Sequence, residues 1–376
     1  MTTFTFARTD NSVVGRWWWT VDRWAVIALT LLIIMGLVLT LAASPAVAER
    51  IGADPFHFVR RQVAFLVPSI AAMFVISLMS VDQVRRLACF AFVLTLAALA
   101  ATLVIGAEIK GSRRWIGVGS LSVQPSEFVK PAFIVVSGWL LAERQRHPGF
   151  PGGILSVLAY LSVVAILLLQ PDFGQTLLVS MMWGAQLFVA GLPMVIVVAL
   201  AGLATVGIVG GYLLLPHVAS RIDRFLNPEA GDTYQVDRSM DAFMSGGLWG
   251  RGPGEGTVKR ILPDAHTDFI FAVAGEEFGM IACLALVLLF AFIVLRLLAR
   301  LLQETDAFVV YAGTGLVCQF GLQAFINMGV NLHLLPAKGM TLPFISYGGS
   351  SMLALAFGMG MLLALSRIRP GVGGYR

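Results

Sequence analysis

The chain has 376 residues, of which 58% are hydrophobic and 12% are charged. Soluble proteins average roughly 45–50% apolar and about 25% charged residues, so this chain has too few polar side chains to cover a globular core. The composition therefore excludes a soluble enzyme and a disordered or collagen-like chain. A net charge of +5 would point to nucleic acid in a soluble protein, but in a membrane protein it concerns orientation, and we expect no nucleic-acid partner.

A helix needs about 20 mostly apolar residues to cross ~30 Å of hydrocarbon. Ten segments fit this description, which predicts an all-α, polytopic membrane domain over residues 24–366. The expected spans lie near 24–43, 62–80, 87–105, 127–142, 153–169, 174–190, 193–214, 268–298, 306–330 and 345–365. We expect no cleavable signal peptide in residues 1–23, where Trp17–Trp19 look like an aromatic anchor at the membrane interface.

An even number of spans places both ends of the chain on the same side of the membrane. The loops on that side are shorter, so their Lys and Arg residues are denser near the span ends, and this density directs insertion. We therefore expect residues 1–23 and 367–376 to be cytoplasmic segments. The large loop at about 215–267, between the seventh and eighth spans, is expected on the other side.

This large loop contains two features of its own. Apolar residues recur at helical spacing over Tyr234–Phe243, which predicts a short interfacial helix. The glycine-rich run Gly246–Gly252 follows, and many glycines indicate tight turns or close backbone approach. A flexible loop is the alternative, but Trp249 in the middle of the run favours a packed loop.

Ionisable side chains at membrane depth are costly and are functional candidates by default. A first group of them comprises Arg113 and Arg114 beside Trp115, followed by Glu127 and Lys130. The two arginines suit an anionic headgroup, with ordinary lipid contact as the alternative. Glu127 and Lys130 are three residues apart and share a helix face, so they either neutralise each other or serve the function directly.

A second group surrounds the start of the eighth span. Asp268 lies at the mouth of that helix, where the positive end of the dipole stabilises a carboxylate. From the residues alone, helix capping by Thr267 or Asp268 is the favoured role. Glu276 and Glu277 lie two turns deeper, so they must face the bundle interior or a wet cavity, and we expect them to pair with Lys130 or an arginine.

A third group precedes the last span. Lys338 is the only charge in its loop, and Ser346 and Tyr347 introduce a helix start rich in small residues. Such a start either binds an anion such as phosphate or allows close helix packing. Asp172 adds a carboxylate at a turn between two spans. These groups suit an amphipathic substrate that carries phosphate, or equally a transported anionic solute.

No metal-binding pattern is diagnostic in this sequence. His266 and His333 are either metal ligands or, more simply, polar loop residues. Cys89, Cys283 and Cys318 all lie in apolar runs, so we expect neither a disulfide framework nor a thiolate metal site.

These groups resemble the motifs of the SEDS family (shape, elongation, division, sporulation), the bacterial membrane glycosyltransferases that polymerise peptidoglycan from lipid II. The resemblance covers nearly the whole chain, and its motifs are Arg113–Ile116, Gln124–Glu127, Gln170–Gly174, Ala265–Phe269 and Ser346–Ser350. The run Leu334–Pro343 is similar to the cell-division member of the family rather than to the elongation member.

The resemblance implies a multi-pass protein of the bacterial inner membrane, at the division septum, with ten spans and cytoplasmic termini. It also implies that Asp268 is the catalytic general base, which replaces the capping role. The implied substrate-binding residues are Arg113, Arg114, Trp115, Lys130, Lys338, Ser346 and Tyr347, and the implied supporting residues are Glu127, Glu276, Glu277, Asp172 and His266. A divalent cation, Mg²⁺ or Mn²⁺, is a further candidate to stabilise the lipid pyrophosphate that leaves.

The implied product is β-1,4-linked glycan, formed with inversion during septal wall synthesis. The implied partners are a class B penicillin-binding protein, which is the septal transpeptidase, and other divisome membrane proteins. The alternatives are a lipid II flippase, an elongation-type polymerase of the lateral wall, and a scaffold. Arg260 departs from the family, whose members often carry an important acidic residue there, so that role is either absent or supplied by a neighbour such as Asp264.

Overall fold

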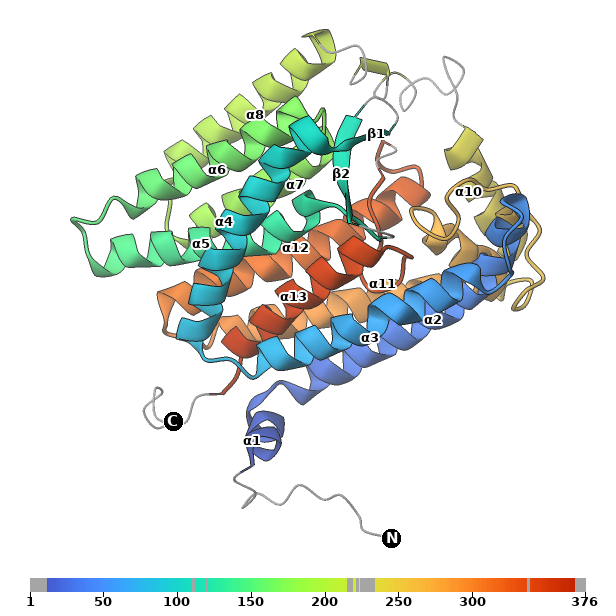
Figure 1. Ribbon diagram of the computed structural model, residues 1–376, viewed down its shortest axis with the longest axis horizontal. Coiled ribbons are helices and arrows are strands. Elements are labelled where there is room, and N and C mark those ends of the chain that lie inside the picture. Colours follow the sequence, from blue (N-terminus) through green and yellow to red (C-terminus); the bar gives the residue numbers. More distant parts are fainter. Residues whose placement is uncertain are drawn as a thin grey trace.

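The computed structural model describes residues 12–109, 112–118, 121–214, 219–220, 223, 234–336 and 339–368. These residues form a bundle of long helices with one small sheet at one end (Figure 1). The elements are α1 (Val13–Thr20), α2 (Arg23–Arg50), α3 (His57–Ser77), α4 (Val81–Ile105), β1 (Ala107–Ile109), β2 (Ser112–Val118), β3 (Leu121–Val123), α5 (Pro125–Arg146), α6 (Gly152–Leu169), α7 (Phe173–Val189), α8 (Met194–Leu214), α10 (Tyr234–Gly246), the 3-10 helix η2 (Val258–Arg260), α11 (Ile270–Leu301), α12 (Ala307–Asn331) and α13 (Gly349–Leu365).

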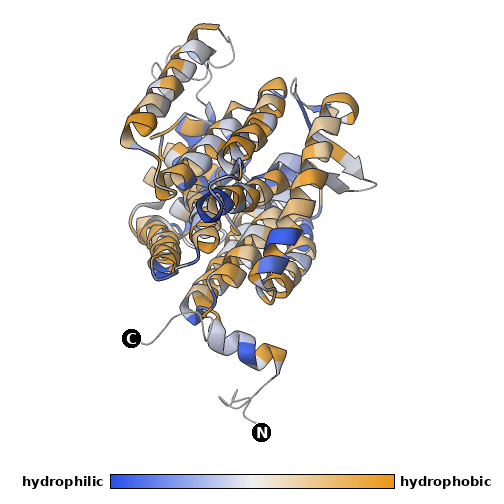
Figure 2. Cartoon of the chain, turned by 90° about the vertical axis from the view of Figure 1, so that its left-hand side faces the viewer, coloured by the Kyte–Doolittle hydropathy of each residue, from blue (hydrophilic) through white to orange (hydrophobic). Residues whose placement is uncertain are grey.

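Each expected span coincides with one helix, from α2 to α8 and from α11 to α13. Six helices of the described part of the chain are long and apolar enough to cross a membrane, namely α2, α3, α4, α6, α11 and α12. Figure 2 shows hydrophobic residues along most of the helices. The chain is thus an all-α, multi-pass membrane protein, as expected, while ten crossings and the boundaries at residues 23 and 366 stay predictions.

Three helices form the centre of the bundle. Most residues of α12 and α13 are buried, as are most of α5. Helix α12 packs on α5, α7 and α11, and α13 packs on α3 and α5. Helix α8 lies at the edge of the bundle (Figure 1). The central helices are therefore screened from lipid, and polar side chains on them face protein.

Both ends of the described chain lie together, at what we call the terminal end of the bundle (Figure 1). The amide of Ile368 donates to the carbonyl of Thr20 at 2.9 Å. Trp17, expected at the membrane interface, is instead buried: its indole N–H donates to Ser77 Oγ at 2.8 Å, and its ring packs edge-on against Phe74. It fastens α1 to the bundle, because a buried indole needs a hydrogen-bond acceptor.

The other end, which we call the distal end, carries the sheet, α10 and the long loops (Figure 1). The sequence between α4 and α5 was expected to be a loop, but it forms three antiparallel strands in the order β1-β2-β3. Trp115 of β2 lies opposite Ala107, and Ile116 lies opposite Val123. β-Branched and aromatic residues of this kind favour a pleated surface, a signal that the hydropathy pattern does not contain.

The large distal loop is packed through its backbone. Helix α10 occupies the segment expected to be helical. The run after it joins α11 at a break, where Gly279 has φ 79° and ψ 178°, a conformation open to glycine. There the Met280 amide donates to the Gly247 carbonyl at 2.9 Å. The glycine-rich run is therefore packed, as predicted. The prediction was based on burial of Trp249, and that reason was wrong, because Trp249 is 81% exposed.

The loop before α13 approaches α2 closely. A Cβ on Gly36 would lie 2.4 Å from the Phe344 carbonyl oxygen, far inside van der Waals contact. Phe344 itself has φ 59° and is buried. A bulky residue in the left-handed region is strained, and it persists only where surrounding packing holds it. Gly36 thus supplies the space that this loop needs.

We expect Gly36→Ala to destabilise the protein by about 1–3 kcal/mol, the usual range for overpacking a well-packed site. The matched control is Gly184→Ala in α7, where a Cβ would meet nothing within 4 Å. That change should leave stability unaltered or raise it by up to about 1 kcal/mol, because alanine is the better helix former. Thermal unfolding in detergent measures both, and a Gly36→Ala protein as stable as the control would contradict the close approach.

Candidate functional site

Asp268 lies at the distal end, half-buried, in the turn directly before α11. Its main chain is held by two amides that lie one turn apart on the central helix α12. Asn327 Nδ2 and Asn331 Nδ2 donate to the Asp268 carbonyl at 2.9 and 2.8 Å. The Oδ1 atom of Asn331 also accepts from the Ala272 amide at 3.1 Å. Asp268 and the start of α11 are thus fixed to the centre of the bundle.

The capping role suggested by the residues alone is not found. The N-cap of α11 is Phe269, which makes no side-chain capping bond. The Thr267 hydroxyl donates to the Asp264 carbonyl at 3.2 Å. The Asp268 carboxylate lies against Gly339, where a Cβ would be 3.1 Å from Oδ2. Glycine at this position leaves room beside the carboxylate.

Ser346 and Tyr347 join the loop before α13 to the Asp268 turn. Ser346 Oγ donates to the Thr267 carbonyl at 2.6 Å and accepts from the Leu342 amide at 2.7 Å. The Tyr347 amide donates to the His266 carbonyl at 2.9 Å. These two residues, expected to contact substrate, make contacts that position the two loops.

His266 packs among aromatic rings. Its ring centroid lies 4.2 Å from that of Phe58 and 5.4 Å from that of Tyr347. Burial lowers the pKa of His266 from 6.5 to about 4, and this outweighs the opposing effect of Asp264. The imidazole is therefore neutral at pH 7, which suits a packing role.

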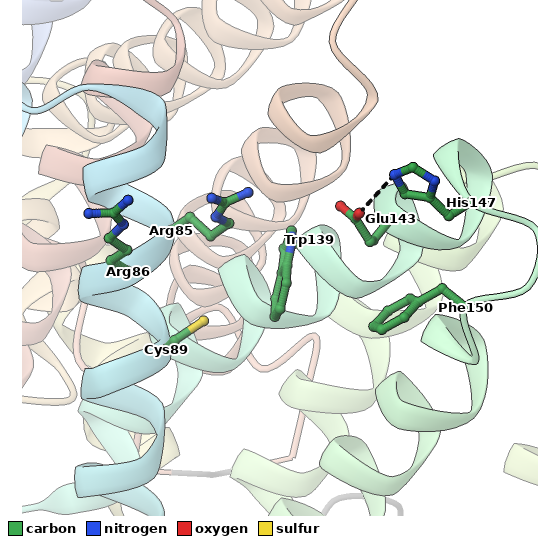
Figure 3. Close-up of a pocket in the computed structure, with 7 residues that line it drawn as sticks. All are labelled: Arg85, Arg86, Cys89, Trp139, Glu143, His147 and Phe150. Atoms are coloured by element: carbon green, nitrogen blue, oxygen red, sulfur yellow. Dashed lines mark ion pairs between the residues drawn. The ribbon is translucent and has the colours of Figure 1, made fainter.

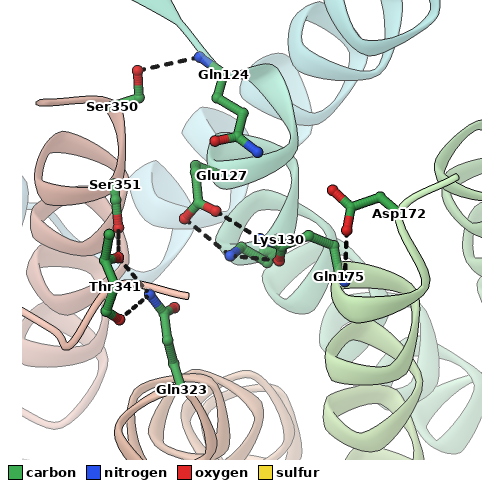
Figure 4. A network of polar contacts seen from close by, with 9 residues as sticks. All are labelled: Gln124, Glu127, Lys130, Asp172, Gln175, Gln323, Thr341, Ser350 and Ser351. Carbon is green, nitrogen blue, oxygen red and sulfur yellow. Dashed lines mark hydrogen bonds and ion pairs between the residues drawn. The ribbon is translucent and has the colours of Figure 1, made fainter. Parts of the chain in front are cut away.

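Glu127, Lys130 and Gln175 form a closed buried network between α5 and α7 (Figure 4). Lys130 Nζ donates to Glu127 Oε2 and to Gln175 Oε1, each at 2.9 Å. Gln175 Nε2 returns a bond to Glu127 Oε1, also at 2.9 Å. Lys130 is 1% exposed. The sequence left two roles open for Glu127 and Lys130, mutual neutralisation and direct function. The observed bond between them corresponds to mutual neutralisation.

Asp172 connects this network to the sheet. Its carboxylate caps α7 by accepting from the Gln175 amide at 3.3 Å, and it pairs with Arg114 NH1 of β2 at 3.3 Å. A second nitrogen of Arg114 donates to the Pro171 carbonyl at 2.8 Å. Arg114 therefore holds the start of α7 with most of its guanidinium.

Hydrogen bonds between neighbouring segments lead from the start of α5 towards the Asp268 turn, and Figure 4 shows those between Gln124 and Ser350 and between Ser351 and Thr341. At the start of α5, the Gln124 amide donates to Ser350 Oγ at 3.1 Å. The hydroxyl of the next residue, Ser351, lies 2.6 Å from that of Thr341. The adjoining Met340 carbonyl accepts from Asn327 at 2.5 Å. The three groups of residues singled out from the sequence thus meet at the distal end.

Glu276 and Glu277 serve a different part of the molecule. The Glu276 carboxylate accepts the backbone amides of Thr257, Val258 and Lys259 at 2.6 to 2.8 Å. Glu277 pairs with the ammonium of Lys259, which also donates to the Ala42 carbonyl at 3.0 Å. The expected pairing with Lys130 or an arginine was wrong, because Lys259 is the closer cation and Lys130 is already satisfied.

The remaining expected site residues are spread around the sheet and the loops. Arg113 pairs with Glu108 at 3.3 Å, with both side chains largely exposed, and Trp115 is half-buried. Lys338 lies outside the described residues. Within the described ranges, no three His, Cys, Asp or Glu side chains gather in a way that could hold a metal ion.

Sequence reasoning missed the amides of α12. Gln319, Gln323, Asn327 and Asn331 recur every four residues, so they line one face of the helix, and all four are buried. Gln323 donates to the Thr341 carbonyl at 3.1 Å. A stripe of amides at a spacing of four within an apolar span is a readable signal, because buried polar groups need partners.

We expect Lys130→Met to destabilise the protein by about 3–5 kcal/mol, because it leaves the Glu127 carboxylate buried without its cation. The double variant Glu127→Gln with Lys130→Met should lose less than the sum of the single changes. Asp54→Asn is the control, because its pair with Arg60 at 3.6 Å is exposed and such pairs contribute roughly 0–1 kcal/mol. Thermal unfolding of the unaltered protein, the two single variants, the double variant and the control tests this, and a Lys130→Met effect no larger than that of the control would contradict the buried network.

A second expectation concerns pH. The pKa of His266 is about 4 in the folded protein against an ordinary value of 6.5, so the unfolded state binds more protons between these values. The free energy of unfolding should therefore fall as the pH falls from 6.5 to 4, by up to about 3 kcal/mol. Unfolding temperatures measured across this range should depend less on pH in His266→Phe. An unchanged pH dependence in that variant would exclude His266 as its source.

Comparisons with known proteins agree with the motifs. The family model for the FtsW/RodA/SpoVE cell cycle proteins matches residues 22–370. A probable peptidoglycan glycosyltransferase FtsW of Caulobacter vibrioides is 47% identical over 99% of this chain and 96% of its own length. The stage V sporulation protein E of Bacillus subtilis is 35% identical over 92% of this chain and 97% of its own.

Solved structures give the same result. A peptidoglycan synthase complex, described as coordinating polymerization and crosslinking, contains a chain with a TM-score of 0.76 and 30% identity, covering 92% of this chain and 97% of that one. The rod shape determining protein RodA of Thermus thermophilus has a TM-score of 0.67 at 29% identity, covering 93% and 97% of the two chains. Since both the family model and the relatives extend over almost the whole length, the chain belongs to the FtsW/RodA/SpoVE family of membrane cell cycle proteins, which is the SEDS family that its motifs resemble.

Proposed function

We propose that this protein is a peptidoglycan glycosyltransferase that polymerises lipid II into β-1,4 glycan strands at the outer face of the cytoplasmic membrane. The observation that carries the proposal is the Asp268 carboxylate. It lies at the distal end, beside Gly339, on a main chain fixed by Asn327 and Asn331. Relatives named as probable peptidoglycan glycosyltransferases support this reading.

The proposed reaction needs one base and one stabilised leaving group. As the acceptor 4-hydroxyl attacks the anomeric carbon of the donor, its proton passes to the Asp268 carboxylate. The new C1–O4 bond forms while the bond from C1 to the pyrophosphate oxygen breaks, and the lipid pyrophosphate leaves with the electron pair. Attack opposite the leaving group inverts the anomeric carbon and gives the β linkage.

The charge on the leaving group requires cationic neighbours. Lys130 is buried and already bonded on two sides, so we assign it to holding α5 and α7 together rather than to contacting pyrophosphate. Arg114 is also engaged, by Asp172 and the Pro171 carbonyl. Arg113, which is largely exposed, and Lys338 are the proposed pyrophosphate contacts.

The proposal also includes a divalent cation that would bind mainly to the pyrophosphate. The described residues offer no cluster of three ligating side chains. A Mg²⁺ or Mn²⁺ ion here would therefore take most of its ligands from the pyrophosphate and water, as Mg²⁺ commonly does in phosphate sites. Such an ion would neutralise the charge that develops on the leaving group.

The proposal includes a location and a partner. Dense Lys and Arg near the terminal end favour a cytoplasmic position for both termini, which places Asp268 on the outer side. A structural neighbour belongs to a complex that coordinates polymerization and crosslinking. We infer a matching partner here, a class B penicillin-binding protein with transpeptidase activity, together with other divisome proteins at the septum.

We expect Asp268→Asn to reduce polymerisation of lipid II by at least about 100-fold, the lower end of what a general base contributes. The assay uses the purified protein with its transpeptidase partner and separates glycan strands on a gel. Glu255→Gln is the matched control, because it makes the same chemical change at an exposed position of the distal end. It should polymerise normally.

Three results would count against parts of the proposal. Long glycan strands from Asp268→Asn, with an unfolding temperature equal to that of the unaltered protein, would exclude Asp268 as the base. Translocation of lipid II in liposomes without any polymer from the unaltered protein would favour the flippase instead. A fluorescent fusion that lies along the lateral wall rather than at midcell would replace the septal role with the elongation role.

A further inference from the structure

A pocket opens at the terminal end of the bundle, far along the helices from Asp268. It lies between α4 and the end of α5, has a volume of about 540 Å³, and is lined by Arg85, Arg86, Cys89, Trp139, Glu143, His147 and Phe150 (Figure 3). This volume falls within the range of about 300–1,000 Å³ that is typical of small-molecule sites. The motifs of the proposed activity use none of these residues.

The polar groups of this pocket are mainly cationic. The Arg85 guanidinium lies 5.8 Å from the centroid of the Trp139 ring, a cation–π distance. Arg85 NH2 also pairs with Asp82 Oδ1 at 3.1 Å, and the Asp82 side chain is exposed. Arg86 makes no ion pair among the described residues. The one acidic lining residue, Glu143, lies 3.4 Å from His147. Arg86 is thus available to an anion, and the only carboxylate paired with Arg85 in the described part of the chain is the exposed Asp82.

The ring of Trp139 lines the pocket, while its indole nitrogen lies behind the pocket surface. Trp139 Nε1 is buried and has no partner within the described part of the chain. An indole N–H at a membrane interface usually finds an acceptor, and a buried donor without one is costly. Because Nε1 has almost no exposed surface, a ligand in the pocket meets the ring of Trp139 and the Arg85 guanidinium instead.

An apolar stripe continues from the pocket along α4. Phe90 and Val93 follow Arg86 at positions i+4 and i+7, so they share its helix face, and each is 69% exposed. Near the start of a helix with the dimensions of a span, this arrangement places the arginines at headgroup depth and the stripe at acyl-chain depth.

We infer that this pocket binds an anionic phospholipid of the leaflet at the terminal end, which is the cytoplasmic leaflet in the proposed orientation. Arg85 and Arg86 bind the phosphodiester, and one acyl chain lies along Phe90 and Val93. The apolar stripe favours a lipid over a soluble phosphate, because an acyl chain that runs along the stripe holds its own headgroup beside the two arginines.

The test measures lipid binding directly and does not depend on polymerase activity. The purified protein in detergent micelles is titrated with dioleoylphosphatidylglycerol or dioleoylphosphatidylcholine, and bound lipid is counted by native mass spectrometry. We expect the anionic lipid to bind more tightly. Arg85→Gln should weaken its binding about tenfold, as loss of a charge-assisted hydrogen bond does.

Two further variants separate the pocket from general charge. Arg144→Gln removes an exposed cation at the same end of the bundle that does not line the pocket, and it should bind the anionic lipid normally. Cys89→Trp keeps both arginines but fills the pocket, and it should weaken binding as Arg85→Gln does. Unfolding temperatures identify any variant that misfolds, and Arg86→Gln replaces Arg85→Gln in that case.

Three outcomes would overturn the inference. Equal binding of the two lipids would exclude selection by charge. Equal losses in Arg85→Gln and Arg144→Gln would exclude the pocket as the site. Complete displacement of the anionic lipid by the same concentration of inorganic phosphate would identify the ligand as a soluble anion instead.

Discussion

The distal end of this protein depends on one constraint, which is that a polar group buried at membrane depth must find its partner within the protein. Helix α12 meets this constraint for the main chain around Asp268, because Asn327 and Asn331 donate to the Asp268 carbonyl and Asn331 Oδ1 accepts from the Ala272 amide. A single carboxylate is thereby held in place by a helix that is itself packed on three sides. Preorganisation of this kind lets a charged group act without first being ordered.

The same constraint accounts for the distribution of the other charges. Lys130 and Glu127 satisfy each other through Gln175, and Asp172 satisfies Arg114. These pairs fix α5, α7 and the sheet relative to one another. Because Lys130 and Arg114 are used in them, few unpaired cations are left near Asp268 among the described residues. Electrostatic support for a leaving group must then come from exposed or loop-borne side chains. The described part of the site is thus a rigid interior whose charges are already paired.

Much of this architecture is predictable from the sequence. Hydropathy locates the helices α2 to α8 and α11 to α13 but not α1, since apolar runs of span length have one structural solution in lipid. The motif that contains Asp268 singles out the carboxylate that we propose as the general base. Hydropathy cannot reveal the sheet after α4, because strand pairing depends on residues that face one another across a turn. It also cannot give the partner of Glu277, since Lys259 becomes its neighbour only when the distal loop folds back onto α11. The spacing of the α12 amides is present in the sequence, but hydropathy does not reveal it, because it averages a polar stripe into an apolar helix.

The break at Gly279 divides α11 into a short first part and a long second part with different hydrogen-bond partners. The first turns of α11, Ile270–Phe278, are tied to the distal loop by the Arg251 and Gly252 amides, which donate to the carbonyls of Glu276 and Glu277. The Glu276 carboxylate adds the three amides of the η2 turn. Beyond Gly279 the helix continues among the spans with its own hydrogen bonds. The short helix after Asp268 is therefore hydrogen-bonded to the distal loop as well as to the bundle, so a displacement of that loop would act on Asp268 across fewer than three helical turns.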